Sequence, residues 1–184
     1  YTPAGTPKVW GNYIYLDTEE RKFFTDNEHD LLFTQTQYQL ATNTDTEIDL
    51  TYFNHPVKSI HLVSGKATGN DWDSEFTFSK SSLYINGTPL FEETSPVYHH
   101  TVVPEMHSSD LPDDILEDLP TFTWPFCISL SRSNPTGTLN FSRIDNAKLA
   151  ITGPSGGNAL HRVYAVNYNI LRVKQGMGGV AFGN

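Results

Sequence analysis

Hydrophobic and polar residues alternate along much of this chain, and that pattern predicts β-strands. The alternation is clear where Asp49 lies between Ile48 and Leu50, because successive side chains of a strand point to opposite faces of its sheet. β-branched and aromatic residues are frequent between turn signals such as Asn86-Gly87. Strands are predicted at 33–40, 47–53, 57–64, 74–78, 82–86, 124–131 and 146–152.

Two further segments are apolar on both sides of the predicted strand. Residues 162–174 form the longest strand, and two apolar faces are typical of the middle of a sheet. Residues 8–16 (KVWGNYIYL) have the same character. Eight or nine strands, few helices and no repeat predict an all-β fold, either a sandwich or a jelly roll, that forms a single domain over residues 1–184.

A short helix is predicted after the first strand. Asp17 is a suitable N-cap, and Glu20, three residues later, can close a capping box. The helix is expected over 18–31, in two pieces because Asp26-Asn27 interrupts it. Its buried contacts are predicted to be Phe23, Phe24, Leu31 and Leu32.

Residues 92–122 are predicted to form a long irregular excursion. They contain prolines at 96, 104, 112 and 120. A stretch of this length in a compact domain is usually a functional surface loop or a small helical insertion.

Composition narrows the functions open to such a domain. The 184 residues include 12 Lys+Arg and 21 Asp+Glu, a net charge of −9, so the chain lacks the clustered bases of a nucleic-acid binder. No apolar run approaches the roughly 20 residues of a membrane span, and no signal peptide opens the chain. Tyr1 in place of a start methionine indicates a piece of a longer protein.

The charge is unevenly distributed. Residues 1–121 hold 20 acids and 6 bases, whereas residues 122–184 hold one acid and 6 bases. The two parts therefore have opposite sign. This asymmetry indicates either pairing of strands within the chain or complementary patches on neighbouring copies.

Candidate metal and sugar sites are weak. His99, His100 and His107, with Glu105, suggest a cupin-like metal centre, but adjacent histidines in a strand point to opposite faces. The acidic run over 110–118 lacks the spacing of a calcium loop. Asp71 and Asp73 flank Trp72 but lie only two residues apart, which does not establish a pair of glycosidase carboxylates. Exposed stacking platforms for sugar would be Trp72, Tyr84 and Trp124.

No motif for a catalytic nucleophile or a phosphate-binding loop is present. The single cysteine, Cys127, excludes an internal disulfide framework and lies in an apolar strand, which predicts a buried and inert thiol. Asn86 and Asn140 match the glycosylation sequon, which matters only if the protein enters the secretory pathway. The residues therefore predict a non-catalytic β-sandwich.

Five segments together resemble the major capsid proteins of nucleocytoplasmic large DNA viruses, the group that includes iridoviruses and chloroviruses. They are YIYLDTEER at 13–21, FNHPVK at 53–58, YHHT at 98–101, NFSRIDNAKL at 140–149 and VYAVNYNILRVKQGMGGVAFGN at 163–184. They occur in family order, and from the first to the last they span most of the chain.

The resemblance implies a structural protein of the virion capsid, with no catalysis and no cofactor. The chain would be one eight-stranded jelly-roll β-sandwich, the second, C-terminal roll of a double jelly-roll subunit, and the first roll is absent from it. Three subunits would form a trimeric, pseudo-hexagonal capsomer, and capsomers would tile an icosahedral shell assembled in the host cytoplasm. The implied partners are further copies, neighbouring capsomers and minor capsid proteins, with no direct nucleic-acid binding.

The matching motifs suggest structural roles for several residues, namely Asn140, Arg143, Asp145, Asn169, Arg172, Gly176 and Gly178. Arg143 and Asp145 are expected to pair, and Asn140 to bond backbone groups rather than carry a glycan. Gly176, Gly178 and Gly179 would allow positive φ or close backbone approach in the tail. Two alternatives stay open, a carbohydrate-binding β-sandwich and a cupin-like metalloenzyme.

Overall fold

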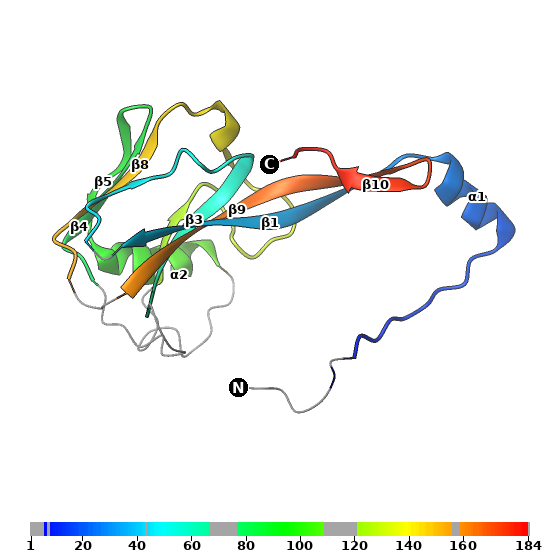
Figure 1. Ribbon diagram of the computed structural model, residues 1–184, viewed down its shortest axis with the longest axis horizontal. Coiled ribbons are helices and arrows are strands. Elements are labelled where there is room, and N and C mark those ends of the chain that lie inside the picture. The colour runs from blue at the N-terminus through cyan, green and yellow to red at the C-terminus, as the bar shows by residue number, and fades with distance from the viewer. Residues whose placement is uncertain are drawn as a thin grey trace.

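The computed structural model describes residues 6, 8–42, 44–66, 77–108, 121–155 and 159–183. Two β-sheets face each other in it, and their strand pairings are antiparallel (Figure 1). The predicted all-β class is confirmed.

The larger sheet has the order β1-β9-β3-β6, and two short strands join it, β10 beside β9 and β7 beside β3. The smaller sheet has the order β2-β8-β4-β5. The bounds of the larger sheet are β1 His29–Thr42, β9 Ala159–Lys174, β3 Pro56–Lys66, β6 Thr121–Pro125, β10 Met177–Val180 and β7 Leu139–Asn140. Those of the smaller sheet are β2 Glu47–Asp49, β8 Ala147–Thr152, β4 Lys80–Ile85 and β5 Thr88–Thr94.

The pairing of the eight main strands is nested, as in a jelly roll. The first strand pairs with the last (β1 with β9), and the second with the next to last (β2 with β8). The third then pairs with the sixth (β3 with β6), and the fourth with the fifth (β4 with β5). A chain that folds back on itself in this way places its first and last strands side by side.

The described residues hold ten strands rather than the predicted eight. The additions β7 and β10 are 2 and 4 residues long and pair antiparallel with β3 and β9, respectively. β5 was also missed, because no strand was predicted at 88–91 and residues 92–94 were assigned to the irregular excursion. Asn86 and Gly87, with φ of 49° and 80°, form the tight turn that returns the chain from β4 into β5.

The hydrophobic core lies between the sheets. Ile60, Ala165 and Trp124 are register neighbours across β3, β9 and β6, and all three are almost fully buried. They pack with Leu83 and Leu149, which are opposite each other on β4 and β8. This alternation of inward apolar and outward polar residues is the one read from the sequence.

α1 (Thr18–Asp26) begins as predicted, with Asp17 and Glu20 forming both halves of a capping box. The second helical piece is wrong, since Asn27 caps the helix through Phe23 O and β1 begins at His29. The predicted burial is also wrong. Phe23, Phe24, Leu31 and Leu32 are each at least half exposed.

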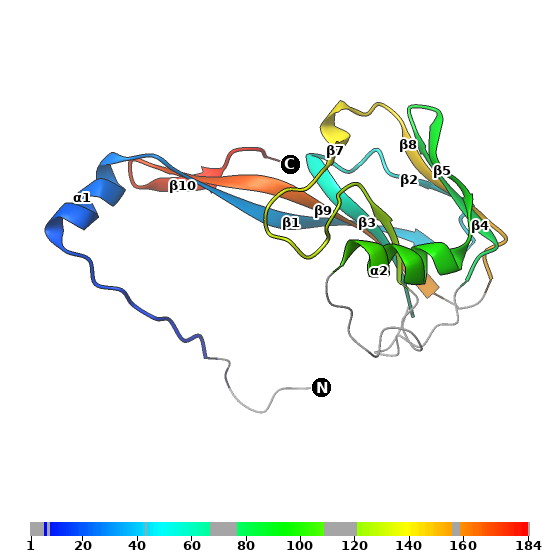
Figure 2. The same cartoon turned by 180° about the vertical axis from the view of Figure 1, so that it is seen from behind.

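The strand predicted at 8–16 is not formed within this roll. The described residues before α1 are extended, belong to neither sheet and are exposed except for Leu16, which is half-buried. In Figures 1 and 2 this segment runs clear of both sheets.

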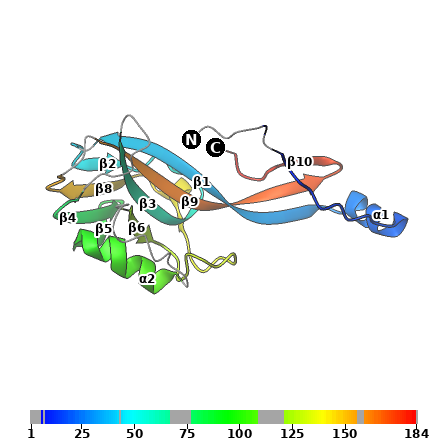
Figure 3. The same ribbon diagram turned by 90° about the horizontal axis from the view of Figure 1, so that it is seen from below.

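The excursion at 92–122 contains the predicted small helical insertion, the π-helix η1 (Tyr98–Val102) followed by α2 (Val103–His107). This insertion lies beside β6 at one side of the sandwich (Figure 3). The acidic run at 110–118, the residues 71–73 and most of the strand predicted at 74–78 lie outside the described residues.

Candidate functional site: the β1–β9 arm

The outer parts of β1 and β9 project from the sandwich and, together with α1 and β10, form an arm (Figures 1 and 2). We define this arm as residues 18–34 and 168–182. It extends beyond the sandwich because β3 pairs with β9 only up to Asn167, whereas β1 follows β9 to Val173. β10 then takes up the side of β9 that β3 leaves open, over residues 171–174.

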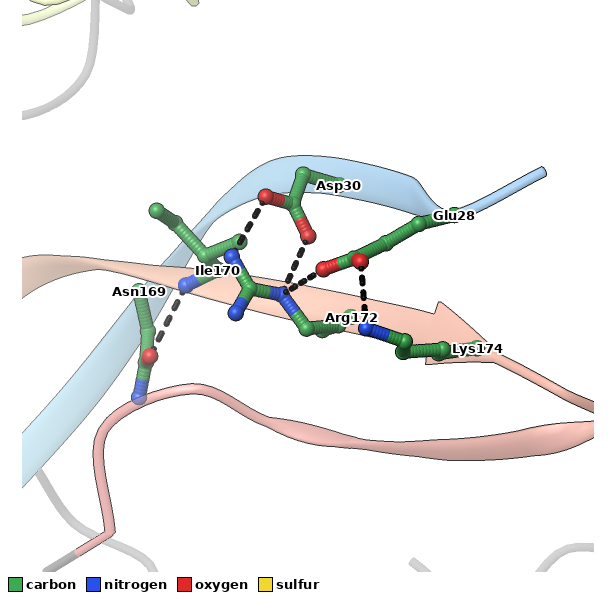
Figure 4. Close-up of polar contacts among 6 residues, drawn as sticks. All are labelled: Glu28, Asp30, Asn169, Ile170, Arg172 and Lys174. Carbon is green, nitrogen blue, oxygen red and sulfur yellow. Dashed lines mark hydrogen bonds and ion pairs between the residues drawn. The ribbon is translucent and has the colours of Figure 1, made fainter.

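Four charged side chains hold the outer end of the arm together (Figure 4). Arg172 and Asp30 are register partners on β9 and β1, and the guanidinium donates two hydrogen bonds of 2.8 Å to the carboxylate. Glu28 lies 2.8 Å from Arg172 Nε and 3.0 Å from Lys174 Nζ. The hydrogen bond from Arg172 lowers the pKa of Asp30, and the same contact raises the pKa of Arg172. Such two-pronged pairs fix strand register as well as adding energy.

Opposite charges from the two parts of the chain therefore pair within one molecule. Besides the arm, Lys148 on β8 lies 2.8 Å from Glu47 on β2. The basic residues Arg172, Lys174 and Lys148 come from the positive C-terminal part, and their partners come from the negative part. Of the two explanations for the charge asymmetry, pairing of strands within the chain accounts for these three bases.

Buried amides tie the tail to the base of the arm. The Asn169 amide donates to Phe182 O at 2.9 Å and to Gln35 Oε1 at 3.1 Å, and its oxygen accepts from Ile170 N–H. Ala181 N–H donates to Ile170 O at 2.8 Å. Asn169 therefore has a clear structural role, the anchoring of the residues after β10.

Only one of the three tail glycines has the positive φ that was expected. Gly176 has φ of 75° and, with Gln175 at 52°, makes the tight turn between β9 and β10. Gly178 and Gly179 lie inside β10 without positive φ. A Cβ at Gly178 would be in ordinary contact with Val173, and one at Gly179 would meet open space, so neither is a close approach.

The arm presents several large apolar side chains to solvent. Leu31 and Leu32 on β1 and Phe23 and Phe24 on α1 are exposed, as are Met177 and Val180 on β10. Leu31 and Val180 are both register partners of Leu171, one on each side of it, and adjoining exposed apolar groups mark interaction surfaces. The arm is thus the part of this roll best suited to contact another protein surface.

Of the three histidines proposed as metal ligands, two instead bond the free edge of β6 and the third bonds the loop that follows it. His99 Nδ1 lies 2.9 Å from Thr123 O and His100 Nδ1 lies 3.0 Å from Thr121 O. Because a carbonyl only accepts, both Nδ1 atoms carry hydrogen. His107 Nδ1 lies 2.9 Å from Cys127 O in the same way. Within the described residues no group of three potential ligands converges, so the cupin-like metal centre is not supported.

Two histidines of this region have strongly lowered pKa values. Burial lowers the pKa of His99, which packs on the Trp124 ring, to about 4. Loss of water contact, with the charge of Lys58 as a second cause, lowers the pKa of His61 to about 4. His61 Nδ1 lies 3.1 Å from Thr123 Oγ1, so both rings bond the same residue of β6.

Neither of the two sugar-stacking platforms that the structure describes is open for stacking. Trp124 has no exposed surface and belongs to the core. Tyr84 is half-buried, and Lys148 Nζ lies 5.6 Å above its ring. Trp72 lies outside the described residues.

Cys127 is buried as predicted, and desolvation raises the pKa of its thiol, which disfavours the reactive thiolate. The role of nearby Lys58 could not be predicted from the sequence. Its ammonium is almost fully buried and donates to Leu130 O and Arg132 O, at 2.6 and 3.2 Å. Lys58 therefore anchors the loop that follows β6.

The sequon asparagines both bond the backbone. Asn140 Oδ1 accepts from Ser142 N–H at the start of η2 (Phe141–Arg143), the use expected of this amide. Asn86 Oδ1 accepts from the N–H groups of Asp145 and Asn146. Among the described ion pairs none joins Arg143 to Asp145, contrary to expectation, because Asp145 is positioned through its backbone instead.

The arm's ion pairs give a first testable expectation. Arg172→Ala removes the guanidinium that joins Asp30 to Glu28, so hydrogen exchange of the amides in 29–32 and 170–173 should become severalfold faster. Raising NaCl to about 1 M, where the Debye length is about 3 Å, should also accelerate exchange of these amides in the wild-type protein. Arg143→Ala is the matched control and should leave exchange in the arm unchanged. Equal exchange in the two variants would contradict a structural role for the network.

Comparison with known proteins agrees with the fold. A family profile described as large eukaryotic DNA virus major capsid protein matches residues 20–179. The major capsid protein of Pyramimonas orientalis virus is 35% identical over 96% of this chain and 48% of its own length. That of Paramecium bursaria Chlorella virus 1 is 27% identical over 97% of this chain and 54% of its own length. The chain thus spans about half the length of these relatives.

Among solved structures, a quasi-atomic model of the PBCV-1 virus capsid superposes with a TM-score of 0.75 at 25% identity. The match covers 94% of this chain and 56% of that chain. The relatives are capsid proteins, which are structural proteins and not enzymes. In the part of the chain that the structure describes, no helix is long and apolar enough to cross a bilayer.

Proposed function

The chain belongs to the family of large eukaryotic DNA virus major capsid proteins, and from this premise we propose that it is the second roll of a double jelly-roll subunit that assembles into trimeric capsomers. The capsomers tile an icosahedral shell. Partners are further copies of the subunit, neighbouring capsomers and minor capsid proteins. Assembly takes place in the host cytoplasm, without direct nucleic-acid binding and without a membrane span.

The observation that carries this proposal is the exposed apolar surface of the arm, which includes Leu31, Leu32 and Val180. Ion pairs between exposed side chains and the buried amide of Asn169 join the strands and the tail of the arm. A preorganised apolar surface loses little conformational freedom on association. Obligate interfaces between subunits commonly bury about 2,000 Å² or more, and symmetric copies would each supply part of that area.

Light scattering of the purified full-length subunit tests the proposal. We expect a mass of three subunits that persists on dilution, because obligate interfaces do not dissociate readily. A monomeric mass at high protein concentration would contradict trimeric assembly. Leu32→Asp, which places a charge on the arm's exposed surface, should shift the mass toward monomer, whereas Tyr52→Asp, also exposed but outside the arm, should not.

A further inference from the structure

β1 is an edge strand of the larger sheet, and one of its two sides is open. It pairs with β9 at each position from His29 to Thr42, without a shift of register. Among the strands that the structure describes, none pairs with β1 on its other side. An edge of this kind is a template for pairing with a further strand.

The even-numbered residues of β1 direct their main-chain N–H and C=O groups to this open side. Ile170 O accepts from Ala181 N–H, which follows β10 on the side of β9 away from β1. Paired residues of antiparallel strands direct these groups either toward each other or away from each other. Leu32, the register partner of Ile170, therefore directs its groups away from β9. Thr42 agrees with this, because its N–H donates to Asp45 Oδ2 at 2.7 Å and its oxygen accepts from Asp45 N–H at 3.1 Å.

The open part of the edge has none of the usual protection against pairing. Among the described hydrogen bonds, none occupies the outward main-chain groups of Leu32, Thr34, Thr36, Tyr38 and Leu40. Natural edge strands are commonly protected by charged side chains, proline or bulges. The sequence LLFTQTQYQLA that contains these residues has neither charge nor proline, and its pairing with β9 has no bulge. The side chains of Leu32, Tyr38 and Leu40 are exposed as well. The edge therefore fits a partner strand.

The residues of β1 are complementary to those of a second copy in one antiparallel register. With the two Thr36 residues opposite each other, Leu32 of one copy lies opposite Leu40 of the other. In the same register Thr34 lies opposite Tyr38. Aromatic and β-branched residues stabilise neighbouring strands when they are opposed, and opposed leucines bury apolar surface. No like charges meet, because this segment is uncharged. The pair is two-fold symmetric, as isologous contacts between identical chains are.

We propose that the open edge of β1 is an interface with a second copy of this chain, in which the two β1 strands pair antiparallel about a two-fold axis at Thr36. This inference rests on the proposed assembly into a capsid, which brings many copies together. A three-fold axis does not generate a two-fold pair, so the contact joins subunits of two different trimers. Main-chain hydrogen bonds supply the binding, and the opposed side chains set the register.

Oxidation of a full-length Thr36→Cys subunit with diamide, at high protein concentration, tests this inference. Directly opposed residues with hydrogen-bonded main chains have Cα atoms about 5.5 Å apart, within the range of about 4.4–6.8 Å that disulfides span. On a non-reducing gel we expect a shift from the mass of one chain to the mass of two. Cys127 is buried and should not contribute.

Thr88→Cys is the matched control, because Thr88 is also an exposed threonine on an edge strand, β5 of the smaller sheet. This variant should stay at the mass of one chain. Absence of linkage in Thr36→Cys would overturn the inference. Equal linkage in the two variants would also overturn it, because it would show random collision.

Hydrogen exchange of the wild-type subunit gives a second measurement that needs no substitution. The amides of Thr36 and Tyr38 should exchange severalfold more slowly as the protein is concentrated, because pairing protects them. Exchange that is independent of concentration would overturn the inference. A trimer whose Thr36→Cys variant does not link overturns this inference alone. Linked pairs of a subunit that is otherwise monomeric overturn trimeric assembly alone.

Discussion

Acidification from pH 7 to pH 4.5 is expected to lower the free energy of unfolding by about 5 kcal/mol. His61 and His99 have pKa values of about 4 in the folded protein, against 6.5 for an unperturbed histidine. One pKa unit corresponds to about 1.36 kcal/mol, so each ring contributes about 2.5 kcal/mol at pH 4.5. Burial also lowers the pKa of His161, and this shift likewise lowers the free energy of unfolding on acidification.

The direction of the pH effect on stability depends on whether the folded or the unfolded state binds more protons. Below pH 6.5 the unfolded chain takes up protons on these histidines while the folded protein keeps them neutral. Stability is therefore lost progressively between pH 6.5 and pH 4, and these two residues cause no further loss below about pH 4.

Urea unfolding of the purified subunit at a series of pH values measures this loss. His99→Gln should flatten the profile between pH 6.5 and pH 4, whereas His29→Gln, on the arm, should leave it unchanged. A wild-type midpoint that stays constant over this range would contradict neutral, desolvated histidines in the folded state.

Trp124→Ala is expected to lower the free energy of unfolding by about 3–5 kcal/mol. Trp124 has no exposed surface, is a register partner of Ile60, and lies 4.5 Å from His99 between ring centroids. Its removal leaves a cavity between the sheets and deprives His99 of its packing surface.

The urea midpoint at pH 7.5 checks this expectation. Tyr52→Ala is the matched control, because it also removes an aromatic ring but from a side chain that is 75% exposed. It should change stability by less than about 0.5 kcal/mol. Similar losses in the two variants would show that Trp124 is not a core residue.

The periodic elements of the roll could be predicted from the sequence. The longest strand, predicted at 162–174, is β9 and lies between β1 and β3, as its two apolar faces required. The capping box located the start of α1 because Asp17 and Glu20 act locally. β5 was missed because Thr88–Thr94 is largely exposed, so its alternation is weak.

Burial was harder to predict than secondary structure. Phe23 and Leu32 are apolar but exposed, since the arm extends beyond the sheets that would cover them. Trp124 suggested a sugar platform and is a core residue instead. Arg172 and Asp30 lie 142 positions apart, so only the strand register brings them together. These contacts depend on tertiary topology, which a local pattern does not contain.

A cryo-electron microscopy map of the virus particle, at a resolution that separates strands, tests the central claim most directly. We predict that each capsomer has three-fold symmetry and a pseudo-hexagonal outline. Its density should contain this roll, with the β1–β9 arm against another roll. Shell density that does not accommodate the nested pairing of β1 with β9 and β2 with β8 would contradict a capsid role for this chain.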